Sequence, residues 1–264
     1  MDFEKFSEDE KFVFSHFIGK TMPLPPHHYH NLFEIYFMED GKCNYFIDNK
    51  SYEVLQGDVV LIPEGVLHKT TYDVENHARI LINCSNAYIP KSVIPYIPKM
   101  MPLYRNPDIS GEIYTLLKQI EEDYTNPDSF SADSIISRTN MLFLLLARHK
   151  NDCEKVISRN IHIEDIINYI RDNYDKPLRL SEISKKFGLS PEHISRTFKK
   201  ETGFGFSEYV TLTRLKNAEV LLINERKTSI SKIAFRCGFN DSNYFSVKFK
   251  NMYGVSPSEY VKLR

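Results

Sequence analysis

Residues 180–212 read LSEISKKFGLSPEHISRTFKKETGFGFSEYVTL, and residues 230–263 read ISKIAFRCGFNDSNYFSVKFKNMYGVSPSEYVKL. The two stretches are copies of one unit, because their serines, glycines, aromatic residues and lysines recur at a nearly constant offset. The offset is 50 residues up to Gly238 and 51 residues from Ser246 onward. Each copy has the pattern of helix, glycine turn and helix, which is the arrangement that places one helix in a DNA major groove.

The first copy contains start and stop signals for two helices. Ser181 is the expected N-cap of a short helix that Gly188 ends, because glycine accepts the left-handed backbone of a tight turn. Ser190 and Pro191 then provide a capping side chain and a proline for the first position of the second helix. Arginine suits guanine and lysine suits phosphate, so the outward face of this helix is a candidate DNA surface. Its residues are Glu192, Ser195, Arg196, Lys199 and Lys200.

The second copy repeats this layout, with Gly238 at the turn and Asn240 or Asp241 as the cap. Its outward face carries Ser242, Asn243, Tyr244, Ser246, Lys248 and Lys250. Between the copies, residues 209–223 predict a helix about 20 Å long at 1.5 Å per residue. Such a rod would hold the two outward helices about 34 Å apart, in successive major grooves.

Residues 161–264 resemble the DNA-binding domain of the AraC/XylS family of transcription regulators. The resemblance implies seven helices, with helix-turn-helix units at about 179–201 and 229–251. It also implies that bases are contacted by Glu192, Ser195 and Arg196 in the first unit and by Ser242, Asn243 and Ser246 in the second. One departure is Val247, which stands where the family commonly has arginine. We therefore expect the first unit to dominate specificity and the second to bind more weakly.

Composition and charge support two different domains. The chain has 264 residues and a net charge of −1, but residues 1–160 hold 16 basic and 23 acidic residues, whereas residues 161–264 hold 18 and 12. A basic C-terminal half fits DNA binding. No apolar run is long enough to span a membrane, the N-terminus lacks the layout of a secretory signal, and the four cysteines have no metal or disulfide spacing, so we expect a cytoplasmic protein.

Residues 12–84 break into short alternating runs separated by turn signals, including DGK at 40–42 and NKS at 49–51. Such spacing predicts a sandwich or barrel of short strands. The expected fold class is therefore two-domain α+β. A barrel at residues 1–108 is followed by a helical segment at 109–150, a linker at 151–160 and an all-α domain at 161–264.

Four side chains in the barrel form a candidate ligand set. Strand alternation places four residues on one face: His28, His30, Glu34 and Tyr36. A third histidine, His68, follows a strand and a proline-glycine turn. Three imidazoles and a carboxylate that converge are able to bind zinc, iron, manganese or nickel. The spacings resemble both motifs of the cupin superfamily, with His28, His30, Glu34 and His68 at the ligand positions, although Tyr72 replaces the usual final asparagine.

Three interpretations of this set are open: hydrogen-bonding groups of a metal-free effector pocket, a metal centre, or a structural relic. Tyr36, Tyr45 and Phe46 would add an aromatic surface for a sugar ring or a small aromatic ligand. The resemblance to the AraC/XylS family implies a small-molecule sensor, often for a sugar. The resulting effector set is His28, His30, Glu34, Tyr36, Tyr45 and His68.

The segment between the domains is expected to be irregular at residues 88–108, where prolines cluster, and helical afterwards. The helix expected at 131–149 is apolar nearly all round, which favours a homodimer seam across 111–149 over a helix buried in the first domain. The family resemblance implies the same dimer, and RNA polymerase as a partner if the protein activates.

The sequence therefore predicts a regulator that binds double-stranded DNA and whose barrel senses a small molecule, a sugar or a related metabolite. Two alternatives remain: a metal-dependent cupin enzyme with a DNA-binding tail, and a constitutive regulator whose barrel only dimerises. No separate acid, base or nucleophile constellation supports the enzyme.

Overall fold

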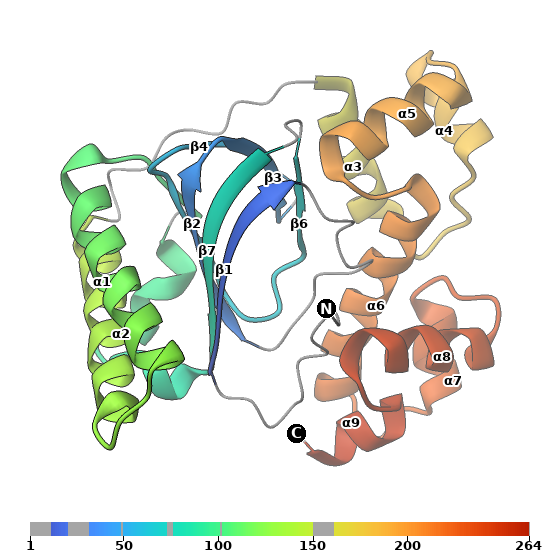
Figure 1. The fold of residues 1–264 in the computed structure, drawn as a ribbon. Coiled ribbons are helices and arrows are strands. Elements are labelled where there is room, and N and C mark those ends of the chain that lie inside the picture. Colours follow the sequence, from blue (N-terminus) through green and yellow to red (C-terminus); the bar gives the residue numbers. More distant parts are fainter. Residues whose placement is uncertain are drawn as a thin grey trace. The chain divides into compact units, whose positions relative to one another are not determined.

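The computed structural model describes residues 12–20, 32–48, 50–72, 76–100, 102–149 and 161–263. The chain divides into two compact units, Met1–Ile157 and Ser158–Arg264. Among the described residues, the first unit holds the strands and two long helices, and the second is helical (Figure 1). The predicted linker at 151–160 lies outside the described residues.

Two antiparallel sheets form the first unit. Their strands are β1 (Phe12–Lys20), β2 (Phe33–Asp40), β3 (Lys42–Ile47), β4 (Lys50–Leu55), β5 (Val59–Ile62), β6 (His68–Thr71), β7 (Asn76–Cys84) and β8 (Leu103–Tyr104). One sheet has the order β1-β7-β2-β5-β8 and the other the order β4-β3-β6. The NKS turn predicted at 49–51 is wrong in its bounds, because strand β4 already begins at Lys50. Asp48 accepts the positive φ of 43° that this tight reversal requires.

Strand alternation gives the five-stranded sheet two buried faces. In β2, Phe33, Ile35 and Phe37 belong to the core beneath the helices. Tyr36 and Met38, on the opposite face, belong to a second core that also includes residues of the three-stranded sheet. The second core therefore lies between the two sheets, and the predicted effector residues of β2 project into it.

Two helices, α1 (Pro107–Thr125) and α2 (Ser131–Arg148), cover the outer face of the five-stranded sheet (Figure 1). The expectation of an irregular segment at 88–108 is wrong in part. Short 3-10 turns occur at Asn86–Tyr88 and Ile94–Lys99, and β8 and the start of α1 also lie within it. Proline is compatible with these positions, since Pro107 occupies the first turn of α1, where its missing N–H has no intrahelical partner.

Helix α2 uses most of its apolar surface inside its own unit. Leu142, Phe143 and Leu146 are fully buried in the core shared with the sheet. Ile136 and Met141 are the large apolar side chains of α2 that remain exposed, at 38% and 47%. The apolar sequence is therefore explained largely by packing on the sheet, and a narrower exposed surface is left for any partner. No described helix has the length and apolar character needed to cross a membrane.

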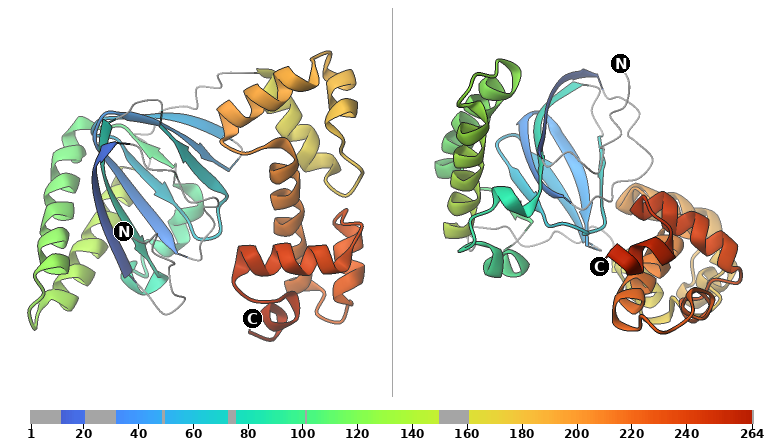
Figure 2. Two further views of the ribbon diagram at one scale, coloured as in Figure 1. Left: turned by 45° about the vertical axis from the view of Figure 1, so that its right-hand side comes forward. Right: turned by 90° about the horizontal axis from the view of Figure 1, so that it is seen from below.

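The second unit consists, in its described residues, of α3 (Ile161–Asn173), α4 (Leu180–Phe187), α5 (Pro191–Thr202), α6 (Phe206–Asn224), α7 (Ile230–Arg236), α8 (Ser242–Tyr253) and α9 (Pro257–Leu263). Helix α6 runs from the α4–α5 pair to the α7–α8 pair (Figure 2). Its 19 residues correspond to about 28 Å, longer than the predicted 20 Å. The helix starts earlier than expected because Glu208 Oε2 accepts a hydrogen bond from the Gly205 backbone N–H at 3.1 Å.

Candidate nucleic-acid interface and effector site

Helices α4 and α5 form the first helix-turn-helix unit. Gly188 closes α4 with φ 67°, as predicted, but the N-cap of α4 is Arg179 and not Ser181, which lies inside the helix. The helix begins earlier because Arg179, in extended backbone, already supplies the first accepting carbonyl, to the Glu182 and Ile183 N–H groups. Ser190 caps α5 by accepting a hydrogen bond from the His193 N–H at 3.1 Å.

Helices α7 and α8 form the second unit. The turn residue Gly238 has φ 84°. Asp241 is the N-cap of α8, and its Oδ1 accepts hydrogen bonds from the Asn243 and Tyr244 N–H groups at 2.7 and 3.4 Å. Of the two predicted caps, the structure therefore uses Asp241. A carboxylate at this end also suits the positive end of the helix dipole.

Helices α5 and α8 each pack into the second unit through two fully buried residues, which are Ile194 and Phe198 in α5 and Phe245 and Phe249 in α8. The opposite face of α5 exposes all five predicted residues, Glu192, Ser195, Arg196, Lys199 and Lys200. This face is thus available to phosphates and base edges.

The predicted face of α8 is less uniform. Asn243, Tyr244 and Lys250 are exposed. Ser242 and Ser246 are half-buried, and the Ser246 hydroxyl donates to the Ser242 carbonyl at 2.8 Å. The Lys248 ammonium lies over the Tyr244 ring, 5.4 Å from its centroid, in cation–π geometry. Two further exposed residues, His193 and Val247, were not among the predicted contacts.

Four predicted effector residues meet between the two sheets. Glu34 and His68 are each 1% exposed, and the Tyr45 hydroxyl donates a short hydrogen bond to Glu34 Oε1. His68 Nε2 lies 3.7 Å from Glu34 Oε2. The Tyr36 and Tyr45 rings pack edge to face, with their centroids 5.2 Å apart. The other two predicted residues, His28 and His30, lie outside the described residues.

Burial keeps the tyrosines of this interior protonated. Burial, followed by the negative charge of Glu34, raises the pKa of Tyr45 well above its usual value. Burial likewise raises the pKa of Tyr36, and it raises the pKa of Tyr72 to about 12. The Tyr36 and Tyr72 hydroxyls lie 3.3 Å apart. These hydroxyls therefore supply donors at neutral pH, while the Glu34 carboxylate supplies acceptors.

The donor set is compatible with a metal only in part. His68 Nδ1 donates to the Val66 carbonyl at 2.8 Å, which directs Nε2 toward Glu34, as in histidines that ligate metals through Nε2. Glu34 and His68 are two of the four predicted ligands. Among the described residues, no group of three His, Cys, Asp or Glu side chains is arranged to hold a metal ion.

Strand β7 adds polar residues that the sequence pattern did not single out. Asn83 pairs with Glu34 across β7 and β2, is 1% exposed, and neither atom of its amide group has a hydrogen-bond partner among the described residues. Arg79 and His77 follow on the same face, and the His77 ring stacks on Tyr72 at 3.8 Å. Burial and the Arg79 charge lower the pKa of His77. Polar residues at alternate positions of the apolar run HARILIN were the available sequence signal.

Phe46 does not belong to this surface. It follows Tyr45 directly in β3, and successive side chains of a strand point to opposite faces. Phe46 is buried on the other side of the three-stranded sheet. The predicted aromatic set is therefore corrected to Tyr36 and Tyr45, with Tyr72 added.

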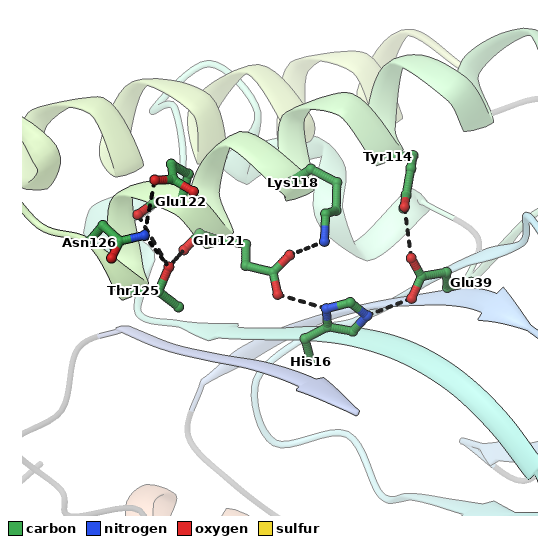
Figure 3. Close-up of polar contacts among 8 residues, drawn as sticks. All are labelled: His16, Glu39, Tyr114, Lys118, Glu121, Glu122, Thr125 and Asn126. Carbon is green, nitrogen blue, oxygen red and sulfur yellow. Dashed lines mark hydrogen bonds and ion pairs between the residues drawn. The ribbon is translucent and has the colours of Figure 1, made fainter. Parts of the chain in front are cut away.

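A second polar cluster joins the sheet to the helix pair (Figure 3). His16 of β1 contacts Glu121 of α1 through Nδ1 and Glu39 of β2 through Nε2. Tyr114 donates to Glu39 at 2.8 Å, and Lys118 donates to Glu121. The cluster connects α1 to strands β1 and β2, on the face of the sheet opposite Glu34.

Comparison with known proteins agrees with this architecture. Residues 16–138 match the family model described as AraC-like ligand binding domain, and residues 183–263 match the one described as helix-turn-helix domain. The chain belongs to the AraC/XylS family. The predicted family, the two-domain α+β class and the function as a DNA-binding transcription regulator with a ligand-binding domain are thereby confirmed.

Relatives in this family align with nearly the whole chain. The HTH-type transcriptional activator RhaR of Mannheimia succiniciproducens is 26% identical and covers 93% of this chain and 94% of its own. The Msm operon regulatory protein of Streptococcus mutans is 26% identical, covering 86% and 83%. Among solved structures, ToxT of Vibrio cholerae covers 96% of this chain and 99% of its own, with 17% identity and a TM-score of 0.40.

Proposed function

We propose that this AraC/XylS regulator senses a small polyhydroxylated molecule, such as a sugar, between the two sheets of its first unit. The observation that carries the proposal is the pairing of Glu34 with Asn83, which places a buried carboxylate beside a buried amide. The Asn83 amide has no hydrogen-bond partner among the described residues. Together they offer acceptors and donors to neighbouring hydroxyl groups. Tyr36 and Tyr45 add the aromatic surface on which a sugar ring packs.

We also propose that effector binding changes the affinity for DNA through a homodimer. The exposed Ile136 and Met141 of α2 support a seam on the helix pair. The His16 cluster supports coupling, because it joins α1 to the sheet whose other face carries Glu34. By linkage, effector and operator DNA must change each other's affinity by one factor.

The names of relatives as transcriptional activators support a role in activation, and hence contact with RNA polymerase. We propose that the chain has no catalytic activity of its own, and the cupin enzyme is one outcome of the test below.

The test is a thermal-shift screen of the full chain with neutral pentoses, hexoses and polyols, followed by operator titration with each hit. A stabilising sugar should change operator affinity in wild type and lose its effect in Glu34→Gln. Glu53→Gln, the same change on the opposite face of the three-stranded sheet, is the matched control. Sugars that bind without altering operator affinity would sink the coupling. Chemical turnover of a hit would favour the enzyme. Constitutive regulation, with no ligand that shifts the thermal stability, would overturn the proposal that the first unit is a sensor.

A further inference from the structure

Helices α5 and α8 are structural equivalents at an offset of 51 residues. Each has 12 residues, Ser190 and Asp241 occupy the same N-cap position, and Gly203 and Gly254 occupy the same C-cap position. Their fully buried residues coincide as well, Ile194 with Phe245 and Phe198 with Phe249. Residues at the same offset therefore present their side chains to DNA in the same way.

The exposed positions differ in chemistry between the two helices. The exposed pairs are Glu192 and Asn243, His193 and Tyr244, Arg196 and Val247, Lys199 and Lys250, and Lys200 and Asn251. In α5, a carboxylate and a guanidinium lie one turn apart. In α8, the same two positions carry an amide and an isopropyl group.

Neither burial nor helix propensity explains Val247. Its side chain is 58% exposed, and β-branched residues are not favoured in helix interiors. Its polar neighbours are partly engaged, since Ser246 donates to the Ser242 carbonyl and Lys248 lies over Tyr244. Asn243 and Val247 are four residues apart in the helix, and this spacing makes them adjacent on its exposed face.

These groups match different base pairs in the major groove. Arginine donates two hydrogen bonds to guanine, and glutamate accepts from the cytosine amino group. Asparagine pairs with adenine through two hydrogen bonds, and an apolar side chain contacts the thymine methyl group, which no other base carries. The α5 pair therefore fits G·C and the α8 pair fits A·T.

We propose that the two units recognise bases of opposite composition: α5 contacts a G·C pair through Arg196, and α8 contacts an A·T step through Asn243 and Val247. The inference rests on the DNA-binding function and is independent of the effector. Because α6, about 28 Å long, spaces the two units, the two elements should lie about one helical turn, or roughly 10 base pairs, apart. In this proposal Val247 determines specificity, whereas the absence of an arginine at this position indicates by itself only weaker DNA binding by the second unit.

The first experiment selects binding sites from a random duplex pool with the full wild-type chain. The expected pool has a conserved G·C position and a conserved A·T step about one turn apart. Arg196→Ala should relax only the G·C position, which assigns that element to α5. A pool with G·C at both elements would overturn the proposal.

The second experiment removes single thymine methyl groups by placing deoxyuridine at each thymine of the selected A·T step. Loss of one buried methyl should weaken wild-type binding about fourfold at one position. In Val247→Ser, thymine and deoxyuridine should bind within a factor of about two, because serine has a helix propensity like that of valine but no apolar contact to lose. The matched control is Val220→Ser on α6, at a valine that is 54% exposed, which should keep the wild-type deoxyuridine effect.

Equal binding of thymine and deoxyuridine by the wild-type chain would exclude Val247 as a methyl contact. A deoxyuridine effect that persists unchanged in Val247→Ser would assign the methyl to another residue and also overturn the proposal. A wild-type chain that selects no sequence at all would instead contradict the DNA-binding function, so the two failures are distinguishable.

Discussion

His16 joins strand β1 to helix α1 through Glu121, with 2.7 Å between His16 Nδ1 and Glu121 Oε1. The other ring nitrogen lies 2.5 Å from Glu39 Oε2 on β2 (Figure 3). Both ring nitrogens of His16 therefore face carboxylate oxygens. One side chain thus bridges three elements, and its carboxylate partners give the sheet–helix junction a dependence on pH.

We expect this junction to weaken in acid. Burial raises the pKa of Glu39, but hydrogen bonds from Tyr114 and His16 outweigh it and place the pKa below the usual 4.5. Hydrogen bonds from Lys118 and His16 likewise outweigh burial and lower the pKa of Glu121. A carboxyl group whose pKa is lowered by folding adds stability above its unfolded pKa, and that stability is lost as the pH falls through the folded pKa.

The measurement is urea unfolding from pH 6 downward. The free energy of unfolding should fall below about pH 4.5, and a Glu39→Gln/Glu121→Gln variant should lose less over that window than wild type. Glu112→Gln, at an exposed position of α1, is the control and should keep the wild-type acid dependence. An identical acid dependence in the double variant would show that the cluster contributes nothing.

Gly238 and Gly188 close the equivalent turns of the two units but differ in their surroundings. Both have positive φ, 84° and 67°. A Cβ at Gly238 would lie 2.6 Å from the Tyr174 carbonyl oxygen, whereas a Cβ at Gly188 would meet nothing within 4 Å. Gly188→Ala should therefore cost only the backbone strain of about 1–2 kcal/mol, and Gly238→Ala should cost more. Chemical unfolding of both variants compares these costs, and equal losses would mean that the second turn relaxes freely.

The second unit could be predicted from sequence nearly in full, because its determinants are local. Caps such as Ser190 and turns such as Gly188 act within a few residues, and the two copies of the repeat carry the same signals. The prediction of Ser181 as an N-cap is wrong because a serine inside a helix and a serine at its N-cap differ only in backbone conformation.

The interior of the first unit was less predictable because strand partners are distant in sequence. A sequence motif predicts Glu34, but Asn83 lies beside it only through the pairing of β2 with β7. The aromatic ring of Phe46 favours its inclusion in the site, although the alternation of β3 places it on the opposite face from Tyr45. Likewise, the sequence around Val247 shows only that an arginine is missing. The equivalence of α5 and α8 shows in addition that Val247 occupies the exposed position that Arg196 has in the first unit.

Arg196 and Lys250 should differ in how their loss affects DNA binding. Arg196→Ala removes a bidentate base contact and should cost about 1–3 kcal/mol while relaxing specificity at one base pair. Lys250→Ala removes an exposed charge suited to phosphate, so it should weaken all sequences similarly and reduce the salt slope by about one. Affinity for specific and random duplexes across a salt series separates the two. If Lys250→Ala proved selective for one sequence, its assignment to phosphate would be wrong.

Metal content separates the two functional interpretations of Glu34 and His68. If these side chains contact the effector directly, the purified chain should contain well below one equivalent of zinc, iron, manganese or nickel, and a chelator should leave the effector-induced thermal shift unchanged. Tyr45 already donates to Glu34 Oε1, which favours this outcome because it gives the buried carboxylate a hydrogen-bond partner other than a cation. Elemental analysis of wild type and of a His28→Ala/His68→Ala variant provides the measurement. Near-stoichiometric metal in wild type that disappears in the double variant would establish a metal centre and replace direct hydroxyl binding as the mode of effector recognition.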